Sequence, residues 1–326
     1  MSDDLDSYAE DSVSLNDGAG AQMTLFTIIV AALLLLGKFA GLIKESLLGH
    51  FFGRGPAVDA FKKIYAGAIF NFYSDAEQLL RPTYLPEFVR QKESDEAQAW
   101  RLTGVMATLT VVALSVVAAG LMLGARPIIR LVWPTVAADP EAFNLAVLML
   151  WIMSPALVIW SLSLMPELTL HAYKRFTIAA FAEACYHVMM MAVLFAGVEL
   201  IWHPNHPRGI LAAALGIASA GVVRLGVMLP ALWSKLKLFR WSLAIRSTPG
   251  VLLALRLMPA LLFGLLVAMG RPIVDTMVCD RLGVGMYSAL DYGRKLSDGL
   301  LTLPLAVSLV VFPYISEWRP RRTGGA

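Results

Sequence analysis

The chain has 326 residues, of which 58% are hydrophobic and 16% charged, and its mean hydropathy is +0.66. A soluble domain of this length is markedly more polar, so the composition predicts an integral membrane protein. The formal net charge of +3 does not indicate a nucleic-acid partner. The two cysteines, Cys185 and Cys279, lie in apolar stretches without the spacing of a metal or disulfide site, and we expect no cofactor and no metal.

Residues 1–22 are rich in acidic and small side chains and lack the basic stretch of a signal peptide. This composition predicts a disordered tail. After the tail, the sequence contains eight segments long enough for a membrane-spanning helix, which needs about 20 residues. They cover residues 23–48, 59–88, 102–124, 142–170, 176–202, 209–233, 251–278 and 286–316. We therefore predict an all-α, polytopic helical bundle with about eight transmembrane helices.

The segment 59–88 is the most polar of the eight. Its charged residues are Lys62, Lys63, Asp75, Glu77 and Arg81, and hydropathy alone would reject it as a span. Two interpretations are open: an amphipathic helix at the membrane surface, or a polar helix that lines a water-filled cavity. We favour the second.

Lysine and arginine in the loops predict the orientation, because they concentrate on the cytoplasmic side. With segment 59–88 counted as a span, one set of loops and tails holds twelve basic residues and the other set holds five. The first set contains Arg90, Lys92, Arg101, Lys174, Arg175, Lys235, Lys237, Arg240, Arg246, Arg319, Arg321 and Arg322, and the second contains Arg54, Arg126, Arg130, Arg208 and Arg281. Both termini are predicted to be cytoplasmic.

Two Gly-x-Gly turns indicate an internal repeat. Gly53-Arg54-Gly55 follows the first span, and Gly283-Val284-Gly285 separates the last two. Parallel repeats are a common plan of secondary transporters. On this interpretation residues 23–245 form a six-helix N-terminal lobe, residues 246–318 form the first two helices of a second lobe, and residues 319–326 form a basic tail. Since a second repeat would stop after two helices, we expect the chain to be incomplete.

Several cations fall inside or at the ends of the predicted spans: Lys38, Lys44, Arg224, Arg256, Arg271, Arg294 and Lys295. A charge at the bilayer centre costs about 2.5–3.5 kcal/mol on insertion scales, so such residues face a polar cavity or a partner. Lys38 and Lys44 are close enough along one helix to reach a single wide cavity, although extension of either side chain to the interface is an alternative. The planar guanidinium of Arg294 suits the oxygens of a diphosphate. A local ladder with Asp291 and Asp298 is its alternative.

Acidic residues supply possible partners for these cations. Asp59 follows the first Gly-x-Gly turn, where it is either an N-cap or first-turn acid or, in addition, an ion-coupling residue. Asp275 lies four residues after Arg271, at the spacing of a helical ion pair. Glu167 and Glu183 are further candidate partners. The sequence contains no nucleophile elbow, phosphate-binding loop or metal motif, so we expect no catalytic residues and no enzyme activity.

Segments 37–45 and 51–61 resemble the first helix and turn of the MurJ/MviN lipid II flippase family, within the MOP flippase superfamily. The resemblance continues at 84–88, 292–296 and 312–316, while Lys38 and Lys44 stand where that family has arginine. It implies a MATE-like lobe with a cationic central cavity, a lipid-linked saccharide diphosphate as substrate, and membrane lipids as neighbours. Lys38, Lys44 and Arg294 would bind the diphosphate, and Asp59 and Asp275 would serve gating or coupling.

The resemblance predicts a flippase-like carrier that moves a peptidoglycan precursor across the bacterial inner membrane by alternating access. Two alternatives stay open at this point. The first is an export carrier for another polysaccharide lipid or a cationic drug, although acidic cavity residues would suit a cationic drug better. The second is an inactive membrane scaffold.

Cysteine labelling tests the predicted orientation. In a variant without Cys185 and Cys279, Asn205→Cys should react with an impermeant thiol reagent in intact cells and Ser94→Cys should not. The reverse pattern would overturn both the loop-charge argument and the assignment of 59–88 as a span.

Overall fold

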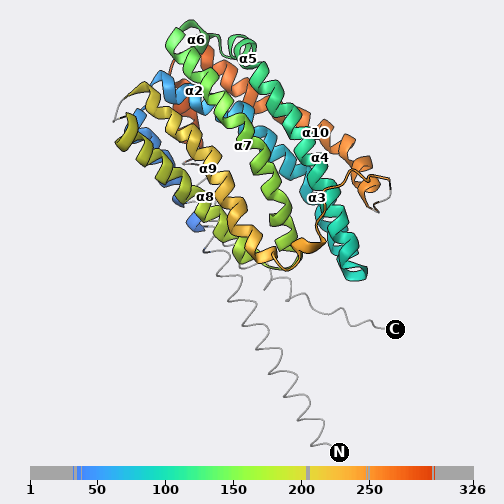
Figure 1. Cartoon of the computed structure of the whole chain (residues 1–326). Coiled ribbons are helices and arrows are strands. Elements are labelled where there is room, and N and C mark those ends of the chain that lie inside the picture. The colour runs from blue at the N-terminus through green and yellow to red at the C-terminus, as the bar shows by residue number, and fades with distance from the viewer. Residues whose placement is uncertain are drawn as a thin grey trace, which may run out of the picture.

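The computed structural model describes residues 32, 35–37, 39–202, 206–246, 248, 250–295 and 297, with the backbone alone at residues 71, 75, 202, 253–255 and 257–269. These residues form a bundle of helices without a strand (Figure 1), which confirms the predicted all-α class. The N-terminal tail, the beginning of the first predicted span and most of the last lie outside the described residues.

The elements follow one another closely along the chain. They are a helix at 39–52, α2 (Pro56–Ile64), the π-helix η1 (Tyr65–Phe70), α3 (Asn71–Ser94), α4 (Glu96–Leu123), α5 (Ala125–Val132), α6 (Pro134–Ala138), α7 (Pro140–Ala172), α8 (Phe176–Ala196), the π-helix η2 (Gly197–Trp202), η3 (Pro207–Gly209), α9 (Ile210–Met228), η4 (Leu229–Leu232), η5 (Leu236–Leu238), α10 (Val251–Leu282) and a helix at 286–295. The predicted lobe boundary at 245–246 falls between η5 and α10, and the division into lobes stays a prediction.

Local capping explains where two of the long helices begin. The side chain of Asp95 accepts hydrogen bonds from the backbone N–H groups of Ala97 and Gln98 at the start of α4. Asp139 accepts from the N–H of Glu141 at the start of α7, and Pro140 occupies the first helical position. These are the side chains that satisfy the unpaired N–H groups of a helix N-terminus.

Four of the described helical segments are long and apolar enough to cross a membrane: Glu96–Leu123, Pro140–Ala172, Phe176–Ile201 and Pro207–Leu232. Apolar side chains such as Val116, Phe195 and Val222 remain exposed on these helices, as expected where lipid is the solvent. Segment Pro207–Leu232 contains α9, which is rich in alanine and glycine on the sides that pack against α7 and α8. Small residues let membrane helices approach closely.

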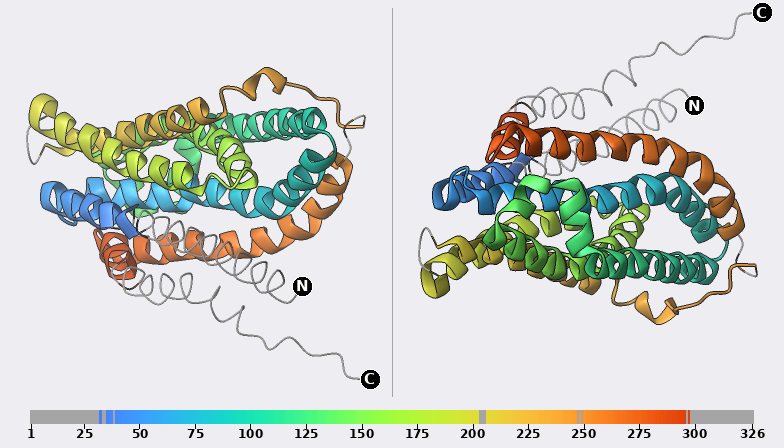
Figure 2. Two further views of the ribbon diagram at one scale, coloured as in Figure 1. Left: turned by 90° about the horizontal axis from the view of Figure 1, so that it is seen from below. Right: turned by 90° about the horizontal axis from the view of Figure 1, so that it is seen from above.

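The polar segment predicted at 59–88 lies inside the bundle. It belongs to α2, η1 and α3, which continue one another from Pro56 to Ser94. Both views in Figure 2 show this stretch between α10 on one side and α7 on the other, and it packs against both. Its residues Lys62 and Lys63 are buried. The structure therefore favours the cavity-lining helix over the surface helix.

The two sets of loops lie at opposite ends of the bundle (Figure 1). At one end, Lys92 donates to the carbonyl of Ala172 at 2.7 Å, and Lys235 pairs with Glu96 at 2.6 Å. This end gathers the loops that follow α3, α7 and α9, which are the more basic set. Which end faces the cytoplasm stays a prediction.

The two Gly-x-Gly turns meet at the other end. Gly53, Gly283 and Gly285 have φ angles of 57°, 121° and 83°, in the region that favours glycine. A Cβ atom on Gly285 would lie 2.6 Å from the carbonyl oxygen of Arg54. The repeated sequence pattern thus corresponds to a direct contact between the two turns.

The close approach of α9 to α7 yields a prediction about stability. A Cβ atom on Gly221 would lie 2.2 Å from Cδ1 of Trp160, whose indole N–H donates to the carbonyl of Ile217 at 3.1 Å. Gly221→Ala should displace the indole and destabilise the protein by about 1–3 kcal/mol, the usual cost of overpacking. Thermal unfolding in detergent measures this.

Gly226 supplies the matched control on the same helix, because a Cβ atom there would meet no atom within 4 Å. Gly226→Ala should be neutral or stabilising by up to about 1 kcal/mol. Equal unfolding temperatures for the two variants would contradict the packing described here.

Candidate functional site

A cavity of about 440 Å³ opens among the helix at 39–52, η1, α3, α7, α8, α9 and the helix at 286–295. Its lining residues are Gly37, Gly41, Leu42, Lys44, Glu45, Tyr65, Ala66, Phe70, Tyr73, Trp160, Glu183, Tyr186, His187, Arg224, Asp291, Arg294 and Lys295. Charged and aromatic side chains make up most of this list. The cavity is therefore a polar compartment inside a predominantly apolar bundle.

One wall of the cavity carries the lysine network, which consists of Lys44, Glu45, Lys62, Asp291 and Lys295. Glu45 pairs with Lys44 at 3.1 Å and with Lys62 at 2.9 Å, and it also accepts a short hydrogen bond from Lys295. Asp291 pairs with Lys62 at 2.7 Å and with Lys295 at 3.1 Å. Three ammonium groups face two carboxylates, so the network has one net positive charge.

Arg294 belongs to the same wall. Its guanidinium lies 2.8 Å from Asp275 on α10, one of the acids expected to pair with these cations, which also has Arg271 at 3.9 Å. The alternative of a local ladder fails for Asp291, because this residue pairs with Lys62 and Lys295 instead, and Asp298 lies outside the described residues. Arg294 is 36% exposed toward the cavity.

Two of the three predicted diphosphate-binding cations therefore line one cavity, while Lys38 lies outside the described residues. Lys44 is only 6% exposed, and its ammonium lies 5.7 Å from the ring centre of Tyr65. Extension of this side chain to the membrane interface is excluded by that burial. Its expected counter-ion, Glu45, is confirmed as a contact.

Asp59 forms a second buried cluster away from the cavity, with Lys63 and Asp280. The ammonium of Lys63 lies 2.8 Å from Asp59 and 2.7 Å from Asp280, and the three side chains are at most 2% exposed. Asp59 also accepts hydrogen bonds from the backbone N–H and hydroxyl of Ser288, at 2.9 and 3.0 Å. We call these four residues the Asp59 cluster.

The Asp59 cluster fastens α2 to α10 and to the helix at 286–295. Asp59 is a first-turn acid of α2, whose N-cap is Gly55. Its side chain reaches across to the N-terminus of the helix at 286–295, where a carboxylate is favoured by the helix dipole. Asp280 extends the contact to α6, because it accepts from the N–H of Thr135 at 2.8 Å.

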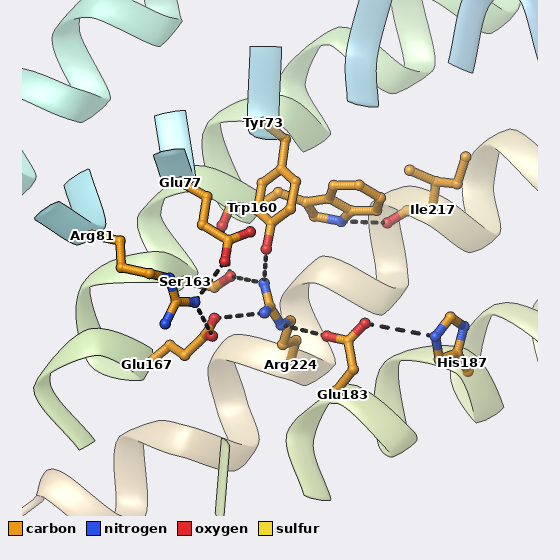
Figure 3. Close-up of polar contacts among 10 residues, drawn as sticks. All are labelled: Tyr73, Glu77, Arg81, Trp160, Ser163, Glu167, Glu183, His187, Ile217 and Arg224. Carbon is orange, nitrogen blue, oxygen red and sulfur yellow. Dashed lines mark hydrogen bonds and ion pairs between the residues drawn. The ribbon is translucent and has the colours of Figure 1, made fainter. Parts of the chain in front are cut away.

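A third cluster, the Arg224 network, lies around Arg224 of α9 (Figure 3) and contributes Tyr73, Glu183, His187 and Arg224 to the lining of the cavity. Arg224 donates to the hydroxyls of Tyr73 at 2.7 Å and Ser163 at 3.0 Å. It pairs with Glu167 at 2.6 Å and, through Nε, with Glu183 at 3.2 Å. The expected pairing of Glu167 and Glu183 with an intramembrane cation is thereby confirmed as a contact.

The Arg224 network extends in two directions, as Figure 3 shows. Arg81 joins it from α3, at 2.6 Å from Glu77 and 3.5 Å from Glu167. On α8, Nε2 of His187 lies 3.6 Å from Glu183. The positions of Tyr73, Ser163 and His187 were not predicted, and single polar residues in apolar helices are the signal that would have indicated them.

The remaining residues that the sequence analysis named as candidates for a functional site lie apart from these clusters. Arg256 is exposed, and Arg271 is 78% exposed. Cys185 and Cys279 are free thiols. Among the described residues, no group of three or more histidine, cysteine, aspartate or glutamate side chains converges on a metal position.

Comparison with solved structures identifies the fold. The structure resembles a lipid II flippase MurJ in an inward closed conformation, with a TM-score of 0.63 and 15% identity over 83% of this chain and 54% of that one. It also resembles the Vibrio cholerae MATE transporter VcmN in the bent form, with a TM-score of 0.64 and 14% identity over 90% of this chain and 66% of that one. The chain therefore shares its fold with both of these solved structures.

Sequence comparison identifies the family. The family model for lipid II flippase MurJ matches residues 48–323, and the chain belongs to that family. It is 29% identical over 305 residues to the lipid II flippase MurJ of Burkholderia cenocepacia. It is 25% identical over 313 residues to the probable lipid II flippase MurJ of Haemophilus influenzae. These matches cover 90% and 89% of this chain and 58% of each relative.

The Asp59 cluster predicts a large effect of one substitution. Lys63→Met should leave two buried carboxylates without the ammonium between them, which costs about 3–5 kcal/mol when a buried ion pair is broken. Thermal unfolding of the purified protein measures the loss. Arg101→Met is the control, since Arg101 and its partner Asp95 are 63% and 49% exposed and such surface pairs contribute little to stability. Equal effects would contradict the structural role assigned to Lys63.

Proposed function

We propose that the chain acts as a carrier for a lipid-linked saccharide diphosphate of the peptidoglycan pathway and moves it across the bacterial inner membrane by alternating access. The observation that carries this proposal is the cavity with a net positive lysine network and Arg294 on one wall. Membership of the lipid II flippase family supports it. Because the chain spans 58% of its relatives' length, the activity and substrate are proposals for this chain.

The chemistry of the cationic wall suits a diphosphate. Lys44, Lys295 and Arg294 line the cavity, and each pairs with a carboxylate. A diphosphate offers several anionic oxygens that replace those carboxylates as partners. Arg294 adds a planar pair of donors, which recognise phosphate oxygens in a bidentate manner. We include Lys38 in this set on the strength of the sequence resemblance.

Asp59 and Asp275 have proposed roles in the conformational cycle. The Asp59 cluster closes the end of the bundle where the two Gly-x-Gly turns meet, and we assign this end to the periplasmic side. Opening there requires α2 to separate from α10 and from the helix at 286–295. Asp275 pairs with Arg294, so substrate binding to Arg294 would release the carboxylate of Asp275 for coupling.

The proposal describes a transporter, with no chemical step and no catalytic residue. From the loop charges we propose that both termini lie in the cytoplasm and that membrane lipids surround the apolar helices. Since the family resemblance implies two lobes, we include a second lobe as a proposed partner. An inactive scaffold and a carrier of another polysaccharide lipid are the outcomes that the binding experiment separates from this proposal.

Binding of a labelled polyprenyl-diphosphate saccharide to the purified protein tests the proposal. Lys44→Ala and Arg294→Ala should each weaken binding about ten-fold or more, because charge-assisted hydrogen bonds contribute roughly 1.5–3 kcal/mol. Arg294→Lys should recover part of the loss, since it keeps the charge without the planar fork. Lys38→Arg should be tolerated.

Arg271→Ala is the matched control, because Arg271 contacts the same Asp275 from a position 78% exposed. It should leave the affinity unchanged. Unchanged affinity in folded Lys44→Ala and Arg294→Ala would overturn the proposed diphosphate site. Absence of binding to the unaltered chain, even with a second lobe supplied, would favour the scaffold.

A further inference from the structure

The cavity has two walls of opposite character, and the proposed function uses only the cationic one. The other wall carries part of the Arg224 network, in which Arg224 faces two carboxylates, Glu167 and Glu183. Of the charged members of the network, only Arg224 and Glu183 line the cavity. Glu183 is 40% exposed and Arg224 only 9%, so the charge that this wall presents is mainly that of a carboxylate. That carboxylate would repel a second phosphate group.

Glu183 presents a fixed carboxylate to the cavity. One oxygen lies 3.2 Å from Nε of Arg224 and the other 3.6 Å from Nε2 of His187, while the side chain is 40% exposed. Arg224 itself is only 9% exposed and is held by Tyr73, Ser163 and Glu167, so it fixes the orientation of Glu183 (Figure 3). A carboxylate has about four acceptor positions, so Glu183 retains capacity to accept hydrogen bonds from a bound molecule.

An aromatic surface lies in the same cavity. The π-helix η1 begins with Tyr65 and ends with Phe70, whose ring centres are 5.6 Å apart. Phe70 is 42% exposed although it lines the cavity. Trp160, only 3% exposed, packs behind with its ring centre 6.2 Å from that of Tyr65. Single-turn π-helices occur often at functional sites.

An exposed ring beside a fixed hydrogen-bond acceptor suits a sugar. A pyranose has an apolar face that packs against an aromatic ring, and hydroxyl groups at its edge that donate to a carboxylate. The cavity volume of about 440 Å³ falls within the range of roughly 300–1,000 Å³ typical of small-molecule sites. The negative wall accepts neutral hydroxyl donors, whereas the positive wall receives the diphosphate.

We infer that Glu183, Phe70 and Tyr65 form a saccharide subsite, which binds the sugar portion of the lipid-linked substrate in the same cavity as the diphosphate-binding cations. This inference rests on the proposed function. It assigns the two walls to two chemically different parts of one substrate: Glu183 accepts from sugar hydroxyls, and Phe70 packs against the sugar ring. Arg224 is a positioning residue that holds Glu183.

Two probes separate the saccharide subsite from the diphosphate site. The first is a polyprenyl diphosphate that carries a disaccharide, and the second is the same polyprenyl diphosphate without sugar. Glu183→Gln and Phe70→Leu should each weaken binding of the first probe about ten-fold and leave binding of the second within about two-fold. Arg294→Ala should weaken binding of both probes.

A matched control comes from α8, the helix that carries Glu183. Phe181→Leu removes a ring that is 52% exposed and does not line the cavity. It should leave the affinities for both probes unchanged. Phe70→Leu leaves the ion pairs that hold the helices together unchanged, since Phe70 is uncharged. Its effect on binding can therefore be read without a loss of these ion pairs.

The possible outcomes are distinct. If the unaltered chain binds both probes but Glu183→Gln and Phe70→Leu weaken both equally, or weaken neither, the saccharide subsite is overturned and the diphosphate site stands. If the unaltered chain binds neither probe, the proposed function fails and the subsite falls with it. Loss confined to the sugar-bearing probe supports the inference.

Discussion

The cost of placing a charge inside a membrane protein determines how this bundle is assembled. Lipid is as apolar as the side chains that face it, so hydrophobic burial alone contributes little to the association of adjacent spans. Ionised side chains inside the bundle do favour association, because each needs a partner. The Asp59 cluster joins α2, α10 and the helix at 286–295, while the Arg224 network joins α3, α7, α8 and α9. The buried ion pairs therefore specify which helices are neighbours.

The need of each charge for a partner also determines where net charge remains in the molecule. The lysine network retains one positive charge beside the cavity, while the Arg224 network exposes the carboxylate of Glu183 to it. The Asp59 cluster has two carboxylates for one ammonium, and donors from Ser288 and Thr135 stabilise the excess negative charge. A cavity whose walls differ in sign favours a substrate with an anionic part and a hydroxyl-rich part. The proposed substrate has both.

Much of the fold was predictable from hydropathy, and the polar helix at 59–88 from its charges. The partners of those charges were not predictable from the sequence. Local spacing indicated pairs of Arg271 with Asp275 and of Arg294 with Asp291, yet Arg294 takes Asp275. Lys63 and Asp280 are separated by 217 residues, and no periodicity within one helix reports such a contact. The cations were found because charges are rare in apolar segments, whereas the aromatic surface at η1 was missed because aromatic residues are common there.

Two adjacent lysines on α2 connect the cavity with the closed end of the bundle. Consecutive residues point about 100° apart around a helix, so Lys62 and Lys63 face different sides of α2. Lys62 belongs to the lysine network and Lys63 to the Asp59 cluster. Under the proposed function, a diphosphate that competes for the lysine network changes the forces on Lys62, and through the rigid helix those on Lys63. α2 is thus the element on which substrate binding and closure of the bundle both depend.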